Sequence, residues 1–340
     1  MKIAAITSSA DDPSRRYRIA QLVDPLARRG VEVEEVVPRI SSYPPKDRMM
    51  RPLWLVRALV ERIGMSRRLD AHDAVVFQRE LVSTLPTVET WFRLPRILDV
   101  DDAIHLYRRG WAARSIASAC AGVVCGNEYL ADWYSKWTSN VAVVPTGVDV
   151  EAYQIAADPS RRGSDDLPVI GWIGSPGNLK YLADIAAPLE RVCRSEGRAR
   201  VEIITDGEAK IPDQWKHWAD LVPWRPGIEY ERIQSWRIGL MPLADGEWER
   251  GKCAFKILQY LAAGVPAIAS PVGMNRTLLG EAEVGLPART ERDWYEAICG
   301  LLLDPTAAYR MGVVGRELVR RDYSVERVAE LWRQILGKWL

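Results

Sequence analysis

The stretch that decides the fold runs from Ile238 to Gly273 and reads IGLMPLADGEWERGKCAFKILQYLAAGVPAIASPVG. Its order predicts a buried strand (IGLMPL), a polar loop, a helix that opens at GKCAF and stops at Gly264, and a second strand (PAIAS). A strand end followed by a helix N-terminus favours anion binding, because backbone N–H groups and the helix dipole point toward the ligand. We therefore expect this segment to bind phosphate.

Helical spacing divides the predicted helix into two faces. Apolar residues share the face expected toward the core: Phe255, Leu258, Leu261 and Ala262. On the other side Lys252, Lys256 and Gln259 follow at intervals of four and three. Two lysines and an amide on one stripe are suited to a diphosphate and a sugar hydroxyl. The alternative is an ordinary solvated face.

Composition argues against several classes of protein and site. A formal net charge of +1 leaves no broad basic field of the kind that binds nucleic acid. The five cysteines form no CxxC pair, which favours free thiols in a reducing cytoplasm over disulfides or a zinc site. The three histidines lack metal-ligand spacing. The opening MKIAAITSS reads as a first strand rather than a signal peptide. We expect a cytoplasmic protein without a metal or other cofactor.

Short apolar runs alternate with helix-length amphipathic stretches along the whole chain. The first half contains IAAIT, VEVEEVV, AVVFQ, RILDV, GVVCG and VAVVP, and the second half contains VIGWIG, VEIIT, IGLMPL and AIASP. Strands separated by helices predict right-handed βαβ units and parallel sheets that are covered on both faces. The polar segment 154–168, rich in Pro, Gly and Asp, separates the two sets. The sequence thus predicts an α/β protein with two doubly wound, Rossmann-like domains and an interdomain cleft for the ligand.

Four segments in order carry a resemblance to a known family. They are VVPTGVDVEAY (143–153), VIGWIGSPGNLKYL (169–182), the stretch 238–273, and the closing helix that YS introduces at 323–324. Together they resemble the GT-B glycosyltransferases, specifically the retaining family 4. Four matching segments in the right order and spacing are stronger evidence for the fold than for the chemistry.

The resemblance implies that successive segments of the chain have different roles. Residues 1–153 would bind the acceptor, 154–168 would link the domains, and 169–322 would bind a nucleotide-diphosphate sugar. The closing helix, 323–340, would pack back on the first domain. The implied reaction is sugar transfer, with retention and without a metal, to a glycan, lipid-linked or small-molecule acceptor. Such transfer belongs to glycan or glycoconjugate biosynthesis.

The chain departs from the family at two acidic positions. The family usually carries two glutamates separated by seven residues, and the matching positions here are Gly251 and Gln259. Gln259 can still hydrogen-bond a ribose hydroxyl, whereas Gly251 offers only its backbone. We expect Glu249 to contact the sugar instead.

The basic residues depart from the family as well. The Arg/Lys pair that grips the diphosphate maps onto Ser175 and Lys180, in the loop that Gly174 opens, so the lysine is kept and the arginine is lost. We expect Lys252 and Lys256 to restore the charge and, with Lys180, to stabilise the leaving diphosphate.

The loop after the first strand departs too. Its expected glycine-rich turn is replaced by SSADDPSRRYR, where Arg16 or Arg18 would face the phosphates.

ILDVDDAIHLY (97–107) ends a strand in three aspartates. A DxD metal site, as in the GT-A fold, is the least favoured interpretation. By the resemblance, Asp101 takes the place of a cleft-facing histidine near the reacting sugar, so we treat it as catalytic. Asp102 is expected to cap a helix near Ala103. Asp99 on the same face would raise the pKa of Asp101, and a nearby arginine, such as Arg16 or Arg18, would lower it.

Further polar residues follow two other strands. Asn127 and Glu128 either cap a helix or contact the acceptor. Arg79 and Glu80 either touch the acceptor or pair with each other. The arginine-rich segment 48–69 is apolar on one side, and it reads either as a peripheral contact with an anionic membrane, at its inner face, or as an ordinary domain helix.

Two other functions compete with transfer. The lost glutamates favour a GT-B protein that binds a nucleotide sugar or glycan without turnover. A nucleotide-sugar epimerase of the same fold is less favoured, because the resemblance to the transferases extends over both domains.

Overall fold

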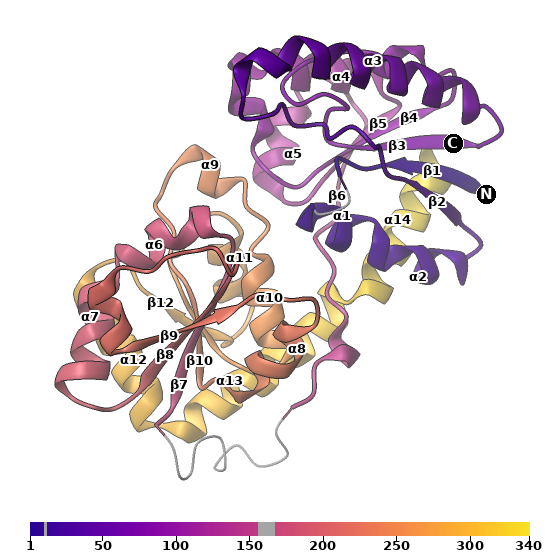
Figure 1. Cartoon of the computed structure of the whole chain (residues 1–340). Helices are drawn as coiled ribbons and strands as arrows, with labels where there is room; N and C mark the ends of the chain where they lie inside the picture. Colours follow the sequence, from indigo (N-terminus) through magenta and orange to yellow (C-terminus); the bar gives the residue numbers. More distant parts are fainter. Residues whose placement is uncertain (10–11, 156–166) are drawn as a thin grey trace. The chain divides into compact units, whose positions relative to one another are not determined.

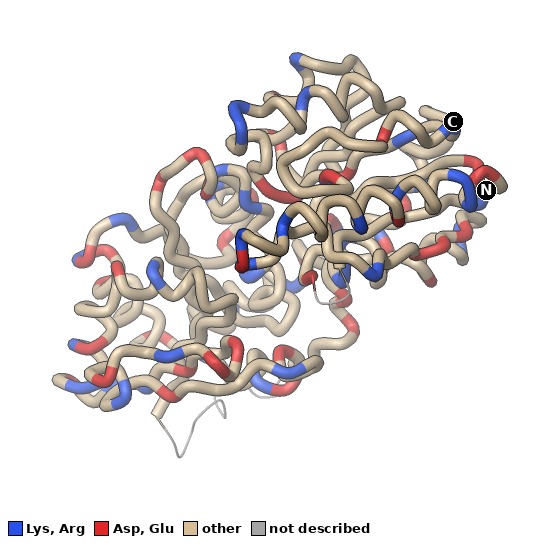
Figure 2. The backbone as a smooth tube through the Cα atoms, turned by 45° about the horizontal axis from the view of Figure 1, so that its top comes forward, with Lys and Arg blue, Asp and Glu red and all other residues tan. Residues whose placement is uncertain are grey.

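The computed structural model describes residues 1–9, 12–155 and 167–340. The predicted linker, 154–168, therefore lies almost entirely outside the described residues. The chain folds into two α/β units, each built on a six-stranded sheet in which every strand pairing is parallel (Figure 1). Acidic and basic residues are interspersed over both units (Figure 2), in keeping with the net charge of +1. The prediction of two doubly wound Rossmann-like domains is confirmed.

The first unit comprises Met1–Gly147, Arg250–Cys253 and Val325–Leu340. Its strand order is β2-β1-β3-β4-β5-β6, so the order reverses between β1 and β3. In such sheets ligands bind beyond the carboxyl ends of the strands at the reversal. The strands are β1 (Lys2–Ile6), β2 (Glu32–Val36), β3 (Ala74–Gln78), β4 (Arg96–Val100), β5 (Gly122–Cys125) and β6 (Val141–Val143).

Helices from both ends of the chain cover this sheet. They are α1 (Pro13–Arg18), α2 (Val23–Ala27), α3 (Arg51–Arg68), α4 (Trp111–Ala119), α5 (Glu128–Tyr134) and α14 (Val325–Trp339). The closing helix α14 packs through Trp332 and Leu336 into the same core as Ile3 and Val76. Its last tryptophan explains a glycine in β5, because a Cβ on Gly122 would lie 2.5 Å from the Trp339 ring.

The second unit comprises Val148–Glu249 and Ala254–Ser324. Its strand order is β12-β11-β10-β7-β8-β9, which places the reversal between β7 and β10. Gly171 lies in β7 where the indole of Trp236 crosses the strand, so that a side chain there would collide with the ring. The strands are β7 (Val169–Ile173), β8 (Arg200–Thr205), β9 (Ala219–Pro223), β10 (Ile238–Met241), β11 (Ala267–Ala269) and β12 (Gly285–Pro287).

Eight α-helices are described around the second sheet. They are α6 (Leu179–Ala183), α7 (Ala186–Glu190), α8 (Ile228–Arg232), α9 (Glu247–Arg250), α10 (Phe255–Ala262), α11 (Met274–Glu281), α12 (Glu291–Leu303) and α13 (Pro305–Leu318). In the described part of the chain no single helix is long and apolar enough to cross a membrane. One bent helix pair, Glu291–Leu303 with Pro305–Tyr323 at 99°, reaches that length and composition together.

The units differ from the predicted division in three places. Val148–Tyr153 groups with the second unit rather than the first, and Arg250–Cys253 groups with the first unit rather than the second. Residues 323 and 324, predicted to open the closing helix, group with the second unit. All ten predicted strands are present, but β9 and β12 were not predicted. These two short strands form the two edges of the second sheet.

Candidate active site

The carboxyl end of β7 and the first turn of α10 meet in the second unit. A Cβ on Gly174, the residue after β7, would lie 2.7 Å from Cε of Lys256, so the lysine stem passes directly over this glycine. The Lys256 ammonium lies 5.8 Å from the ring centroid of Trp172. Gly174 thus leaves room for a cation beside the strand reversal. The structure brings these two predicted donor residues together.

The helix α10 begins later than predicted. Ala254 precedes it in a left-handed conformation with φ of +50°, and among the described residues no side chain caps this end. Because the chain is not helical before Phe255, Lys252 does not share a stripe with Lys256, and it belongs to the segment Arg250–Cys253 of the first unit. The predicted stripe of two lysines and an amide is therefore wrong.

Gln259 also differs from its prediction. Its side chain is buried within α10, and its Nε2 donates to the hydroxyl of Tyr153 at 3.1 Å. Its Nε2 is therefore engaged within the unit, and the predicted contact with a ribose hydroxyl stays a prediction for its Oε1. Two other predicted donor residues remain accessible: Ser175 is exposed, and so is Lys180 in α6, whose ammonium lies 4.7 Å from the ring centroid of Tyr181.

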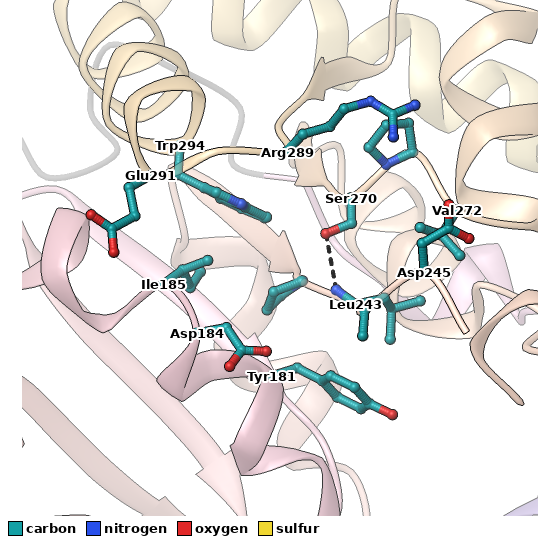
Figure 3. Close-up of a pocket in the computed structure, with 13 residues that line it drawn as sticks. Tyr181, Asp184, Ile185, Leu243, Asp245, Ser270, Val272, Arg289, Glu291 and Trp294 are labelled. Atoms are coloured by element: carbon teal, nitrogen blue, oxygen red, sulfur yellow. Dashed lines mark hydrogen bonds between the residues drawn. The ribbon is translucent and has the colours of Figure 1, made fainter.

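A cavity of about 330 Å³ opens beside these residues in the second unit. Its walls come from the segments after β10 and β11, from α6, and from the start of α12 (Figure 3). Apolar walls such as Leu243 and Trp294 are joined by exposed charged groups, among them Asp184 and Arg289. The backbone N–H of Leu243 donates to Ser270 Oγ at 3.0 Å and fixes the two strand ends to each other. A cavity of this size, with apolar and charged walls, is suited to a small, partly polar ligand.

Glu249 does not line this cavity, but it contacts a residue that does. It is buried, and its carboxylate accepts a hydrogen bond from the hydroxyl of Tyr181, which lines the cavity. Burial raises the pKa of Tyr181, and the bond to Glu249 raises it further, so the phenol stays a donor at neutral pH. Tyr181 thereby holds Glu249 at the edge of the cavity. Sequence reasoning missed Tyr181, although its position in the helix after β7 was a usable signal.

The first unit gathers its charges beyond the carboxyl ends of β3 and β4. Arg79 follows β3 and donates to Asp101 Oδ1 from Nε at 2.9 Å and from Nη2 at 2.7 Å. The same Nη2 donates to Asp102 at 2.6 Å and to Ser14 Oγ at 2.8 Å. Arg79 also has a φ of +63°, a conformation that costs a residue with a side chain on the order of 1 kcal/mol or more and that clusters at functional sites.

Asp101 stays ionised because of these neighbours. Burial raises its pKa, but the charges of Arg79 and Arg18 and a hydrogen bond from Ser14 outweigh burial and hold the pKa below its usual range. For Asp102, burial and the charge of Asp101 together raise the pKa. Arg79 was expected to touch the acceptor or pair with Glu80. It is instead the principal counter-ion of this aspartate pair.

Arg18 and Asp99 form a separate buried pair, and both side chains are 1% exposed. Arg18 donates to both carboxylate oxygens, and also to the carbonyl of Val144 at 2.8 Å. The prediction that Arg18 faces the phosphates is therefore wrong, because its guanidinium is fully engaged in the core. Arg16 is only partly buried and lies over the ring of Tyr17, so its phosphate contact stays a prediction.

Asn127 holds the segment Arg250–Cys253 in place. Its Oδ1 caps α5 by accepting from the N–H of Leu130, and its Nδ2 donates to the carbonyls of Gly251 and Lys252 at 2.9 and 3.2 Å. Its acceptor contact is therefore wrong, and its capping role is confirmed. Glu128 is exposed at the start of α5, so its acceptor contact stays a prediction.

The segment Arg250–Cys253 approaches the aspartates of the first unit closely. The thiol of Cys253 donates to the carbonyl of Asp101 at 3.1 Å, and the charge of Lys252 offsets a small part of the rise in the pKa of Asp102. A Cβ on Gly251 would lie 2.7 Å from Cβ of Ala103, which explains why this position has no side chain. Asp102 does not cap a helix as predicted, since the residue at the start of the 3-10 turn Ile104–Gly110 is Ala103.

The donor set of the described residues offers little to a metal ion. Within 1–9, 12–155 and 167–340 no group of three or more His, Cys, Asp or Glu side chains could hold one. The aspartates at 99, 101 and 102 are neutralised by arginines instead. Metal-independent activity stays a prediction.

Comparisons with known proteins point in one direction. Residues 167–304 match the family model described as Glycosyl transferases group 1. No curated protein sequence matches the chain. Among solved structures, sucrose-phosphate synthase from Thermosynechococcus elongatus is 14% identical with a TM-score of 0.74, over 99% of this chain and 100% of that one. HepE from Anabaena, in complex with UDP-glucose, is 12% identical with a TM-score of 0.73, over 99% and 100%.

A third structure agrees with these two. A glycosyltransferase from Rickettsia africae is 11% identical with a TM-score of 0.66, over 98% of each chain. Identities this low establish the fold, which is GT-B, and the family match covers the second unit's sheet up to the end of α12. The chain is therefore a glycosyltransferase of GT-B fold, and its residues 167–304 are similar to the glycosyl transferases group 1.

Proposed function

We propose that this enzyme transfers a sugar from a nucleotide-diphosphate donor to a hydroxyl acceptor, with retention of configuration and without a metal, in glycan or glycoconjugate biosynthesis. The family match over 167–304 supports sugar transfer. The similar HepE structure holds UDP-glucose, which supports a nucleotide-sugar donor for this chain.

The donor is assigned to the second unit. Its diphosphate would lie at Gly174, with Lys256 and the start of α10 supplying positive charge and backbone dipoles. The nucleoside would enter the cavity of about 330 Å³, and Glu249, held by Tyr181, would accept a hydrogen bond from the sugar. The observation that carries the proposal is Lys256 lying over Gly174 at the strand reversal, in the unit whose segments after β10 and β11 line this cavity.

The protein contributes to the reaction chiefly by electrostatic stabilisation of the transition state. As the bond to the diphosphate breaks, negative charge grows on the leaving oxygen and Lys256 stabilises it. Positive charge grows at the anomeric carbon, and the ionised Asp101 is the candidate for stabilising it, with Arg79 fixing its orientation. The acceptor is assigned to the first unit, where Arg16 and Glu128 are the accessible candidates for contacting it.

Screening the protein against UDP-, GDP-, ADP- and dTDP-sugars tests this function. Thermal stabilisation identifies the donor, and release of the nucleoside diphosphate in the presence of glycan, lipid-linked and small-molecule acceptors identifies turnover. Transfer requires both results for the same donor. If none of these donors stabilised the protein or was consumed, a nucleotide-sugar transferase would be excluded.

A second candidate is a nucleotide-sugar or glycan-binding protein without turnover. Two observations favour it: Ala103 leaves no space for a side chain at Gly251, and Gln259 is hydrogen-bonded to Tyr153. These are the positions at which the resembling family carries its glutamates. A donor that stabilises the protein but is never consumed, whatever the acceptor, would identify this function instead.

A further inference from the structure

The helix α3 carries an apolar stripe on its solvent face. Leu53, Val56 and Val60 are 52%, 59% and 65% exposed, and Met49, in the turn before the helix, is 85% exposed. Their spacing of four, three and four residues places them on one side of a helix. Residues on the opposite side, such as Ala58 and Met65, are buried against the unit. A stripe of this kind normally faces a core.

Scattered apolar residues are ordinary on a protein surface, but a continuous row of four is not. The row also lies on the longest helix of the first unit, and Figure 1 shows this helix at the periphery of its unit. We expect an apolar row in this position to be covered by the surface of another molecule or assembly.

Charge indicates what that surface is. Arg57, Arg67 and Arg68 are exposed on α3, and the segment before it adds exposed Lys46 and Arg48 beside one exposed aspartate, Asp47. The one carboxylate in the helix sequence turns inward. The carboxylate of Glu61 accepts from the backbone N–H groups of Arg39 and Ile40 at 2.7 and 3.0 Å, and it pairs with the buried Arg62. The outer face of α3 is therefore apolar and positively charged together.

We propose that α3 lies on the surface of an anionic lipid bilayer. Met49, Leu53, Val56 and Val60 enter the boundary between headgroups and acyl chains, while the arginines contact lipid phosphates. A bilayer fits better than an acidic protein because it satisfies the apolar row and the arginines at the same time. The helix lies on the membrane rather than across it, since four of its eighteen residues are buried in the unit. The proposal concerns attachment alone and does not depend on the proposed function.

Co-sedimentation of the full chain with vesicles tests the proposal. We expect binding to equimolar phosphatidylcholine and phosphatidylglycerol, little binding to phosphatidylcholine alone, and weakening by salt. Replacing Arg57, Arg67 and Arg68 by Gln should weaken partitioning roughly 100-fold, at about fivefold for each charge. Replacing Leu53, Val56 and Val60 by Gln should weaken it by at least roughly tenfold, because each side chain loses its transfer from water.

A matched control comes from the second unit. Leu303 and Val313 are 72% and 39% exposed, so the double Gln variant removes exposed apolar surface away from α3 and should bind vesicles like the parent. Thermal unfolding checks that all variants fold. Equal vesicle binding by the parent and the Leu53/Val56/Val60 variant would overturn the proposal. So would a parent that forms a dimer through this stripe, or that binds polyglutamate, but does not bind the mixed vesicles.

Discussion

Arg79 and Asp101 form the central ion pair of the first unit, with two N–H groups of the arginine directed at one carboxylate oxygen at 2.9 and 2.7 Å. The pair lies just beyond β3 and β4, and Arg79 adopts a left-handed backbone to reach it. This geometry keeps Asp101 charged and fixes its direction. Charge and fixed direction are the two properties that electrostatic stabilisation of a transition state requires.

The first prediction concerns the charge of Asp101. Asp101→Asn keeps the size of the side chain and removes its charge, so turnover of the folded enzyme should fall by roughly 10²-fold, while nucleotide affinity changes little. Stability should also fall, because Arg79 loses a charged partner. Asp102→Asn is the matched control, because it removes the neighbouring charge and leaves the Arg79–Asp101 pair intact. Steady-state kinetics are measured at a temperature at which thermal unfolding shows each variant to be folded: unchanged turnover of Asp101→Asn would remove Asp101 from the active site.

The second prediction concerns Lys256. Lys256→Ala should weaken nucleotide-sugar binding by about 1.5–3 kcal/mol, the value of a hydrogen bond to a charged group. Lys210, exposed in the same unit, provides the control substitution. Isothermal titration with the donor measures the difference. Unchanged affinity and turnover in Lys256→Ala would refute the placement of the diphosphate.

The third prediction concerns the glycine at a position where the resembling family has a glutamate. Gly251→Ala should destabilise the protein by about 1–3 kcal/mol, because the new methyl group collides with Ala103. Gly280→Ala, in α11 with no atom within 4 Å of the new Cβ among those described, should be neutral or stabilising. Denaturant unfolding of the two variants measures the contrast. Equal stability would mean that this segment is not held against Ala103.

The fourth prediction concerns pH. Burial raises the pKa of Glu80 from its ordinary value of 4.5 to about 7. The unfolded chain therefore gives up this proton more easily than the folded one, and the protein loses stability as pH rises from 4.5 through 7. Glu80→Gln removes the titration, so it should be more stable than the parent at pH 8 by on the order of 3 kcal/mol and equal to it at pH 4.5. A stability difference that does not change with pH would contradict this.

The fifth prediction is that EDTA leaves turnover unchanged. The aspartates nearest to a DxD pattern are paired with Arg18 and Arg79, which leaves little affinity for a cation. Turnover that disappears in EDTA and returns with manganese or magnesium would make these aspartates metal ligands.

The fold was predictable because its strongest strands are continuous apolar runs. The two strands that were not predicted, β9 and β12, are short edge strands whose residues are mostly half-buried or exposed, and each ends in a proline. The side chains of an edge strand pack against fewer neighbouring residues than those of a central strand. The hydrophobic pattern in the sequence of an edge strand is therefore weak.

The proximity of Gly174 and Lys256 was predictable from the sequence, but the partners of the aspartates were not. Gly174 and Lys256 could be placed because each lies next to a strong element boundary. The partner of Asp101 could not, because Arg16, Arg18 and Arg79 all follow strands, and only the packing shows that Arg18 is buried with Asp99. The left-handed Ala254, which removes Lys252 from the helix, has no sequence signal, since alanine ordinarily continues a helix.

The central claim is tested most directly by the release of nucleoside diphosphate from UDP-, GDP-, ADP- and dTDP-sugars in the presence of acceptors, with proton NMR of the glycosidic product. The account predicts that one donor is consumed, that the product keeps the donor's anomeric configuration, and that Lys256→Ala loses most of the activity. A donor that stabilises the protein but is never consumed would contradict the account, and so would a product of inverted configuration.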